Sequence, residues 1–486
     1  MNTLKNKISN YLSKNCILIF AVVSLLIMLN RIPFWDETHA YSISRLLLSE
    51  IWFLTRIEGH PILWYLIIKP FSSLDLYPWS MWIINWIFCL GAIFVLWKSA
   101  PFSPVVKTLI TFSTPFLYYF APVARCYSVG ILLLFLICAY YKKRFKKPFL
   151  FSLLIAISAH TSIMVAVGSF YIGLLFLYDL FLKLKSKTFS FKKVLGIVFI
   201  FLSSAIFLIL QFIGMRKPLV ENKLEVWNVL SRSAIFPQAI SVFPLILHLV
   251  CSIAFYYFAY LTFKKTKRGF FFISLTYLTL TLIFLFIYKG SHWNYYFYFV
   301  YFILLFWIFG RKILINKFAK ILFVSILVLF IFPKAVLETG KMDLIYASRS
   351  KLIAKQIVNN EFLKNSKLYT LEWWSDLAPG ALMYLERENI YIYDLHNRKR
   401  TSFESIKNIF YMEHEIIDFD VFYKEMDKNS YLLSMGSLFK QKFSNLMVIE
   451  QKNGDYVFKT KNRIYYLKKV LQPKEINLTV YKVNEL

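Results

Sequence analysis

The chain of 486 residues is 58% hydrophobic and 19% aromatic, and only 17% of its residues are charged. Soluble domains do not sustain that apolar fraction, so the composition excludes a wholly soluble protein and indicates repeated membrane-spanning helices. A net charge of +30 would suit a nucleic-acid-binding protein, but here the lysines lie in short loops between apolar runs, as the positive-inside rule requires. We therefore expect a lipid bilayer around the protein and no nucleic-acid partner.

The cysteines all lie in or beside apolar runs, and none shows the paired spacing of a metal site. Cysteines of this kind pack as small hydrophobic residues. We expect neither a disulfide nor a zinc site from this pattern. They are Cys16, Cys89, Cys126, Cys138 and Cys251.

Clusters of lysine and arginine without any acidic residue separate the apolar runs and predict the topology. Placing every cluster in the cytoplasm gives an α-helical polytopic protein of the cytoplasmic membrane with about eleven spans. Its N-terminus is then cytoplasmic and its C-terminal part extracytoplasmic. The clusters lie at residues 5–14, 98–107, 142–147, 183–193, 264–268 and 311–320. The predicted spans are 16–32, 79–97, 105–122, 125–141, 149–160, 163–181, 195–213, 237–262, 269–288, 293–310 and 320–335.

A long outer loop, residues 33–78, follows the first predicted span. Within it, the apolar segment 60–71 is too short to cross a bilayer and is predicted to be an interfacial or re-entrant helix. The run 149–160 is also short. Together with 163–181, it is predicted to form a hairpin that reaches the outer face near His160.

The composition changes near Lys341. Residues 341–486 mix lysine, glutamate, aspartate and asparagine with short alternating runs at 389–393 and 463–467. Such alternation is typical of half-buried strands. We therefore predict two domains, a multi-spanning membrane domain at 1–340 and an extracytoplasmic soluble α/β domain at 341–486.

Polar residues from distant parts of the sequence are predicted to lie on the same outer face. The first outer loop contains Trp35-Asp36-Glu37-Thr38-His39 and Glu58-Gly59-His60-Pro61, and a carboxylate at a membrane boundary is a functional candidate because it is costly unless solvated or paired. Later outer turns add further basic and aromatic side chains. The candidate site residues are Asp36, Glu37, Glu58, His60, Arg125, Tyr127, Lys289 and His292.

These residue types suit group transfer onto a hydroxyl or amine. A carboxylate can take the proton of the acceptor, and arginine, lysine or histidine can hold a phosphate leaving group. Nucleotide sugars are not found outside the cytoplasmic membrane. A donor there is therefore expected to be a polyprenyl-phosphate-linked sugar, with its tail in the bilayer and its phosphate at the headgroup level.

The chain resembles the GT-C superfamily of polyprenyl-phosphate-sugar-dependent glycosyltransferases, especially bacterial relatives of protein O-mannosyltransferases and the aminoarabinose transferase. The resemblance covers roughly residues 15–335. It is carried by Trp35-Asp36-Glu37 with His39-Ala40-Tyr41, by Glu58-Gly59-His60-Pro61-Ile62-Leu63-Trp64-Tyr65, by Arg125-Cys126-Tyr127 and by Ser291-His292-Trp293.

The resemblance implies an inverting membrane glycosyltransferase that transfers one sugar to a cell-envelope acceptor, which is a lipid, a glycan or a protein. It implies that Asp36 is the catalytic base, that Glu37 shares or supports this role, and that Arg125 lies near the donor phosphate. No second acidic motif follows the third predicted helix, where metal-binding relatives carry one, so the sequence does not support a metal or other cofactor, although a carboxylate pair can bind a divalent ion.

Other interpretations of the same residues remain open. Asp36 and Glu37 also suit the first turn of an interfacial helix at 38–55, where acids favour the helix dipole, and His60 suits a helix start before Pro61. A transporter or flippase of lipid-linked saccharides is the alternative function, although such proteins usually show internal repeats, and none stands out here. A receptor with an outer sensor domain is a third possibility.

Overall fold

The computed structural model describes most of the helical part of the chain and segments of the C-terminal part. Within it, two compact units are formed by Met1–Asn30 with Thr55–Gly340, and by Arg31–Leu54 with Lys341–Leu486. We call them unit 1 and unit 2. The described residues are 2–31, 33, 35–58, 60–74, 76–212, 257–287, 292–314, 317–329, 354–370, 384–393, 398–399, 419–426, 430–434, 447–450, 455–460, 463–471 and 479–485.

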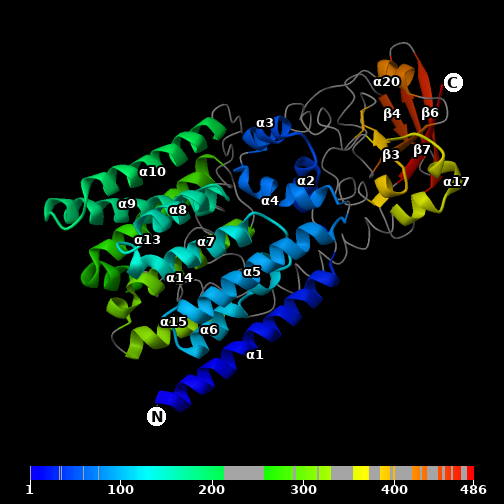
Figure 1. Cartoon of the computed structure of the whole chain (residues 1–486). Helices are drawn as coiled ribbons and strands as arrows, with labels where there is room; N and C mark the ends of the chain where they lie inside the picture. The colour runs from blue at the N-terminus through cyan, green and yellow to red at the C-terminus, as the bar shows by residue number, and fades with distance from the viewer. Residues whose placement is uncertain are drawn as a thin grey trace. The chain divides into compact units, whose positions relative to one another are not determined.

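Unit 1 is built from helices (Figure 1), as its continuous apolar runs predict. Helix α3, Leu48–Glu58, crosses the boundary between the units at Thr55. The helices of unit 1 are α1 (Asn2–Leu29), α4 (Leu63–Ser72), α5 (Trp79–Ser99), α6 (Pro104–Thr111), η1 (Pro115–Phe120), α7 (Tyr127–Tyr140), η2 (Tyr141–Lys143), α8 (Pro148–Ala159), α9 (Ile163–Lys185), α10 (Phe191–Phe212), α13 (Lys267–Phe286), α14 (His292–Ile313) and α15 (Lys317–Leu329).

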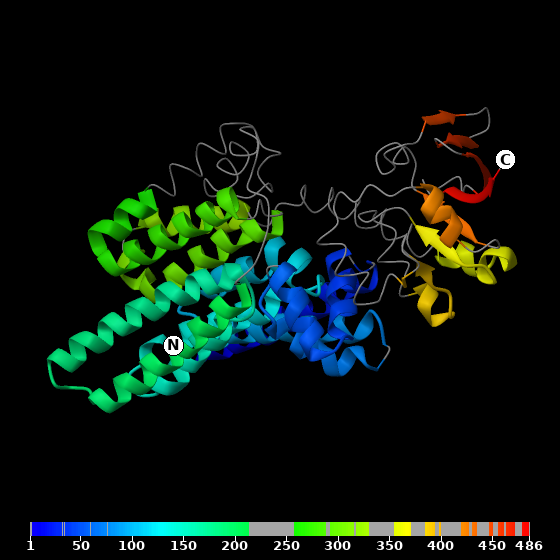
Figure 2. The same ribbon diagram turned by 90° about the horizontal axis from the view of Figure 1, so that it is seen from above.

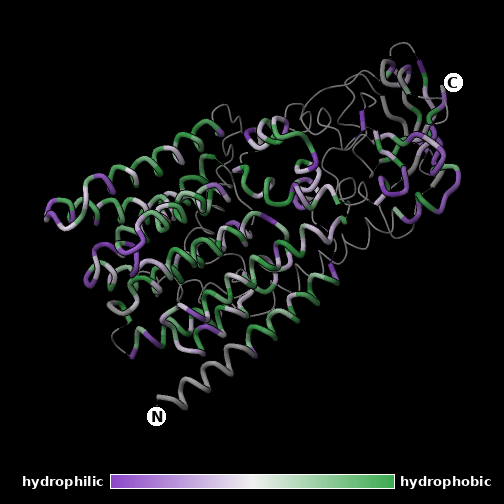
Figure 3. Tube along the Cα trace, viewed as in Figure 1, coloured by the Kyte–Doolittle hydropathy of each residue, from purple (hydrophilic) through white to green (hydrophobic). Residues whose placement is uncertain are grey.

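Five helices among the described residues are long and apolar enough to cross a bilayer. All of them except the largely buried Trp293–Gly310 carry large exposed apolar side chains, such as Phe199 at 70% exposure, and a contiguous apolar surface of this kind marks contact with lipid. Figure 3 shows the same helices as largely hydrophobic along their length. The five are Trp79–Ser99, Ile163–Lys185, Phe191–Phe212, Lys267–Phe286 and Trp293–Gly310.

The structure thus has the character of a helical membrane protein, while the count of eleven spans stays a prediction. The predicted span 149–160 corresponds to α8, which has only 12 residues, and most of the predicted span 237–262 lies outside the described residues. The predicted short helix at 60–71 corresponds to α4, a 10-residue helix that contains Pro70.

Helices α8, α9 and α10 lie side by side in unit 1 (Figures 1 and 2), with α13 packed on α9. Nearly every residue from Trp293 to Gly310 of α14 is buried, whereas Ile197 and Gln211 are the buried residues of α10. Helix α14 therefore lies at the centre of the helical packing and α10 at its edge. Of the two buried residues of α10, Gln211 is the polar one.

The predicted single helix at 105–122 is wrong, because the chain there forms two pieces. Helix α6 ends at Thr111, and the π-helical turn η1 begins at Pro115. Proline lacks an N–H donor, and its ring clashes with the carbonyl four residues earlier, so it interrupts a helix. Two carbonyl groups at the end of η1, those of Phe120 and Ala121, accept hydrogen bonds from Asn85 Nδ2 at 3.0 and 2.9 Å.

The first loop folds as short helices instead of one helix at 38–55. Helix α2 spans Trp35–Ser44, and α3 begins at Leu48. Glu50 Oε2 accepts the backbone N–H of Leu47 at 2.8 Å, which satisfies one of the amide groups left over at the start of α3. This capping contact fixes the break between the two helices.

Unit 2 contains a mixed seven-stranded sheet in the order β2-β1-β3-β7-β6-β5-β4. Strands β1, β2 and β3 pair in parallel, and the remaining pairs are antiparallel. The alternating runs of the sequence correspond to β2 and β6. The strands are β1 (Leu368–Thr370), β2 (Ile392–Tyr393), β3 (Tyr431–Ser434), β4 (Met447–Glu450), β5 (Tyr456–Lys459), β6 (Ile464–Leu471) and β7 (Thr479–Glu485), and short helices α17 (Glu361–Lys364) and α20 (Phe419–Glu425) accompany them.

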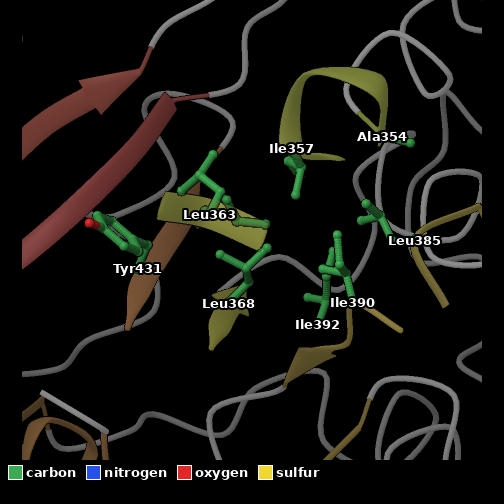
Figure 4. Close-up of a cluster of buried hydrophobic side chains, with 9 residues drawn as sticks. Ala354, Ile357, Leu363, Leu368, Leu385, Ile390, Ile392 and Tyr431 are labelled. Atoms are coloured by element: carbon green, nitrogen blue, oxygen red, sulfur yellow. The ribbon is translucent and has the colours of Figure 1, made fainter. Parts of the chain in front are cut away.

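Two apolar clusters form the core of unit 2. In the first, Leu363 of α17 packs with Leu368 of β1 and Ile392 of β2 (Figure 4). In the second, Phe419 of α20 packs with Tyr465 of β6. Helices α17 and α20 thus bury apolar residues against the strands, as an α/β arrangement requires.

Candidate functional site

The two carboxylates of the first loop lie in the first turn of α2 and have different surroundings. Glu37 is fully buried, and both of its oxygens accept from the Arg31 guanidinium, Oε1 from Nη1 at 3.0 Å and Oε2 from Nη2 at 2.7 Å. Arg31 is itself only 7% exposed. This bidentate geometry is the strongest form of an arginine–carboxylate pair, so Glu37 anchors the start of α2.

Asp36 is half-buried at the same turn. The unsatisfied N–H groups at the start of a helix favour an acidic residue there, so the position of Asp36 suits the start of α2. Its partial exposure leaves access that the fully buried Glu37 lacks. Of the two predicted catalytic acids, Asp36 has the more suitable surroundings for proton transfer. His39, one turn further on, is buried.

In unit 1, two predicted residues from distant segments meet. Arg125 Nη2 lies 3.1 Å from His60 Nε2, and Arg125 is only 5% exposed. A guanidinium donates hydrogen bonds and cannot accept them, so His60 Nε2 is the acceptor and the ring proton lies on Nδ1. The contact therefore places a cation in a unit built mainly from apolar helices.

The backbone around Arg125 is shaped by the interrupted helix before it. The turn η1 ends at Phe120, Arg125 lies in the following turn, and α7 begins at Tyr127. The Phe120 carbonyl accepts from Asn85 Nδ2 and from the Ser128 hydroxyl. Local π-helical geometry is frequent at functional sites, and here it turns the chain so that Arg125 reaches His60.

Tyr127 is buried against α14. Asn294 Nδ2 donates to the Tyr127 hydroxyl at 2.7 Å, and the Tyr127 ring packs edge to face on Phe297. Asn294 is 1% exposed and was not among the predicted residues. Since this contact is internal, Tyr127 joins α7 to α14.

The other predicted residues are described only in part. Glu58 is the last residue of α3, and His292 is the first residue of α14. Lys289 lies outside the described residues.

Two residues that the sequence did not single out, Thr55 and Gln211, lie beside His60. The amide nitrogen Nε2 of Gln211, near the end of α10, lies 3.2 Å from the His60 carbonyl and 3.3 Å from the Thr55 hydroxyl. Gln211 is fully buried. In the sequence, the only hint of this role is that Gln211 is an amide within the mainly apolar run 195–213. The structure thus brings together Thr55, His60, Arg125 and Gln211, which we call the polar cluster.

His160 serves packing. Its Nε2 lies 2.9 Å from the Ser204 hydroxyl, and its ring packs edge to face on Phe207. Both partners belong to α10, so this histidine joins the end of α8 to α10.

An apolar cavity of about 520 Å³ lies between α8, α9, α10 and α13. Its lining is almost wholly aliphatic and aromatic, with Ile155, Phe170 and Phe201 among the larger side chains. Ser169, Ser204 and Thr279 add hydroxyl groups, and those of Ser169 and Ser204 bond within unit 1. The cavity therefore suits a hydrocarbon chain.

Over the described segments, no group of three or more histidine, cysteine, aspartate or glutamate residues is arranged to hold a metal ion.

Neither a scan against models of known protein families nor a search among curated protein sequences finds a match for this chain.

Proposed function

We propose that this protein is a membrane glycosyltransferase that moves a sugar from a polyprenyl-phosphate donor to a cell-envelope acceptor. The observation that carries the proposal is the buried guanidinium of Arg125 beside His60. A guanidinium makes charge-assisted hydrogen bonds to phosphate oxygens, so this buried cation suits the phosphate of a lipid at headgroup level. The proposed face of the membrane is the extracytoplasmic one, as the placement of the basic clusters predicts.

Asp36 is the proposed general base. Its carboxylate takes the proton of the acceptor hydroxyl or amine while the acceptor atom bonds to the anomeric carbon. The bond between that carbon and the phosphate oxygen breaks with inversion, and polyprenyl phosphate leaves with the electron pair. Glu37 holds the base in place through Arg31 and does not itself exchange a proton.

Arg125 is the proposed partner of the phosphate oxygens, whose charge rises as the bond breaks. The apolar cavity between α8, α9, α10 and α13 is lined by aliphatic and aromatic side chains, which suit an isoprenoid tail. A long lipid tail, an anionic headgroup and a transferable sugar together define the donor class.

The direct test of the donor class uses purified protein in lipid nanodiscs. We expect radiolabelled polyprenyl-phosphate sugar to bind, and Arg125→Ala to weaken binding of the sugar-free polyprenyl phosphate as well, because the phosphate interaction is lost. Lys192→Ala, which removes a basic residue from the cytoplasmic cluster 183–193, is the matched control and should bind as the wild type does. Binding that is equal in Arg125→Ala and wild type would remove Arg125 from the phosphate site.

A transporter of lipid-linked saccharides is the competing assignment. It predicts that a labelled lipid-linked saccharide crosses the bilayer of a proteoliposome without cleavage of its sugar–phosphate bond. The glycosyltransferase proposal predicts cleavage.

A further inference from the structure

The amide of Gln211 has a defined orientation. A carbonyl oxygen only accepts hydrogen bonds, so the group that faces the His60 carbonyl must be the amide nitrogen. The same nitrogen reaches the Thr55 hydroxyl. Both contacts are made by Nε2, and the planar amide therefore directs Oε1 away from His60 and Thr55.

Gln211 Oε1 is buried and has no hydrogen-bond partner within the part of the chain that the structure describes. A buried acceptor without a donor costs free energy, so native proteins rarely leave one. Gln211 is also one of only two buried residues on α10. The helix thus presents one oriented acceptor at the polar cluster.

The ligand that would satisfy Gln211 must reach the residues around His60. Arg125 contacts the imidazole of His60 and the amide nitrogen of Gln211 contacts its carbonyl, so a guanidinium and an amide that carries a further acceptor both adjoin His60. A phosphate suits the guanidinium, and a hydroxyl or amino group suits the amide oxygen. A sugar phosphate carries both kinds of group.

We propose that Gln211 is a specificity-determining residue, whose Oε1 accepts a hydrogen bond from a hydroxyl or amino group on the sugar of the lipid-linked donor. This inference rests on the proposed function, because it takes Arg125 as the site of the donor phosphate. Gln211 then recognises the sugar and Arg125 the phosphate.

The test compares two ligands in nanodiscs, polyprenyl phosphate without a sugar and the best-binding member of a panel of polyprenyl-phosphate hexoses and pentoses. Gln211→Met keeps the length of the side chain and removes both the acceptor Oε1 and the donor Nε2. We expect it to weaken binding of the sugar-bearing ligand about three- to tenfold, the value of one hydrogen bond between neutral groups. Binding of the sugar-free ligand should stay unchanged.

Two further variants separate recognition from folding. Gln211→Asn retains an amide on a side chain that is shorter by one methylene group. We expect it to weaken binding of the sugar-bearing ligand and to leave binding of the sugar-free ligand unchanged. Ser203→Leu is the matched control, since Ser203 is exposed on the same helix, and it should bind both ligands as the wild type does. The Asn variant decides the test if the Met variant does not fold, as judged by its thermal unfolding.

The outcomes distinguish the two proposals. A loss that is equal for the sugar-bearing and sugar-free ligands, or no loss at all, would overturn the role of Gln211 while leaving the glycosyltransferase proposal intact. Wild-type protein that binds neither ligand would overturn the proposed function itself.

Discussion

Asp36 and Glu37 are adjacent in sequence, yet only Glu37 is held in a buried ion pair. We expect Glu37→Gln to lower the free energy of unfolding by about 3–5 kcal/mol, because it leaves the buried Arg31 guanidinium without its charge partner. Asp36→Asn should lower the unfolding temperature less, since Asp36 is only half-buried whereas Glu37 is fully buried. Thermal unfolding in nanodiscs measures both, and equal destabilisation would contradict the separate roles.

The individual site residues were only partly predictable. The acids of the first loop stand out because carboxylates are costly near a bilayer. The partner of Glu37 was not predictable, because Arg31 lay within the predicted span 16–32. The role of Gln211 was not predictable for a similar reason. A single amide at the end of an apolar run does not indicate a site, and only the fold brings Gln211 next to His60.

At the scale of the helices, α9 and α14 meet at a glycine. The Tyr301 hydroxyl accepts from the Gly168 N–H at 3.1 Å and donates to the Met164 carbonyl, so it is inserted between a donor and an acceptor four residues apart on α9. A Cβ at Gly168 would lie 2.1 Å from the Tyr301 ring. The close approach of α14 therefore depends on the absence of a side chain there.

We expect Gly168→Ala to destabilise unit 1 by about 1–3 kcal/mol, the usual range for overpacking. Gly173→Ala on the same helix is the matched control. Its Cβ would approach Ile155 to 3.6 Å, which is an ordinary contact. Thermal unfolding of the two variants checks this, and equal stability would show that α14 adjusts without loss.

In unit 2, the half-buried Asp455 carboxylate joins the residue before β5 to the neighbouring strand β6. It accepts from the Tyr466 hydroxyl at 2.5 Å and from the Lys469 N–H at 2.8 Å. These hydrogen bonds, the tyrosine's first, lower the pKa of Asp455 below its ordinary value of 3.8. Because the folded pKa is lowered, the stabilisation is present above about pH 3.8 and is lost as the pH falls through the folded value.

Hydrogen exchange of the peptide containing Lys469 tests this pH dependence. After correction for intrinsic rates, we expect Tyr466→Phe to lower protection at pH 6. The difference from wild type should shrink as the pH falls below 3.8. A difference that does not change with pH would mean that the tyrosine acts by packing alone.

The elements differ in how far the sequence determines them. Proline predicts the helix break at Pro115. The apolar pattern continues through this position, however, and by itself indicates one unbroken helix. The strands β2 and β6 were visible as alternating runs, but the order of the sheet depends on pairing between distant segments. Composition alone is enough to indicate a membrane protein. The number of spans is harder to predict, because it depends on whether helices as short as α8, with 12 residues, cross the membrane.

For the whole molecule, the topology predicts opposite accessibility at two exposed positions. In a background without native cysteines, Glu388→Cys of unit 2 should react with a membrane-impermeant maleimide on intact cells. Lys185→Cys, at the end of α9 and within the basic cluster 183–193, should react only after permeabilisation, because the positive-inside rule places it in the cytoplasm. Reaction of Lys185→Cys on intact cells would contradict the predicted orientation.

The central claim is that the protein cleaves a polyprenyl-phosphate sugar with Asp36 as the base. The most direct measurement is donor turnover by purified protein in nanodiscs with a crude cell-envelope acceptor, comparing wild type with Asp36→Asn at equal folded fraction. We predict turnover by the wild type and a loss of at least about a hundredfold in the variant, as expected when a general base is removed. Turnover that is equal in both proteins would contradict the role of Asp36, and transport of intact donor without cleavage would contradict the glycosyltransferase itself.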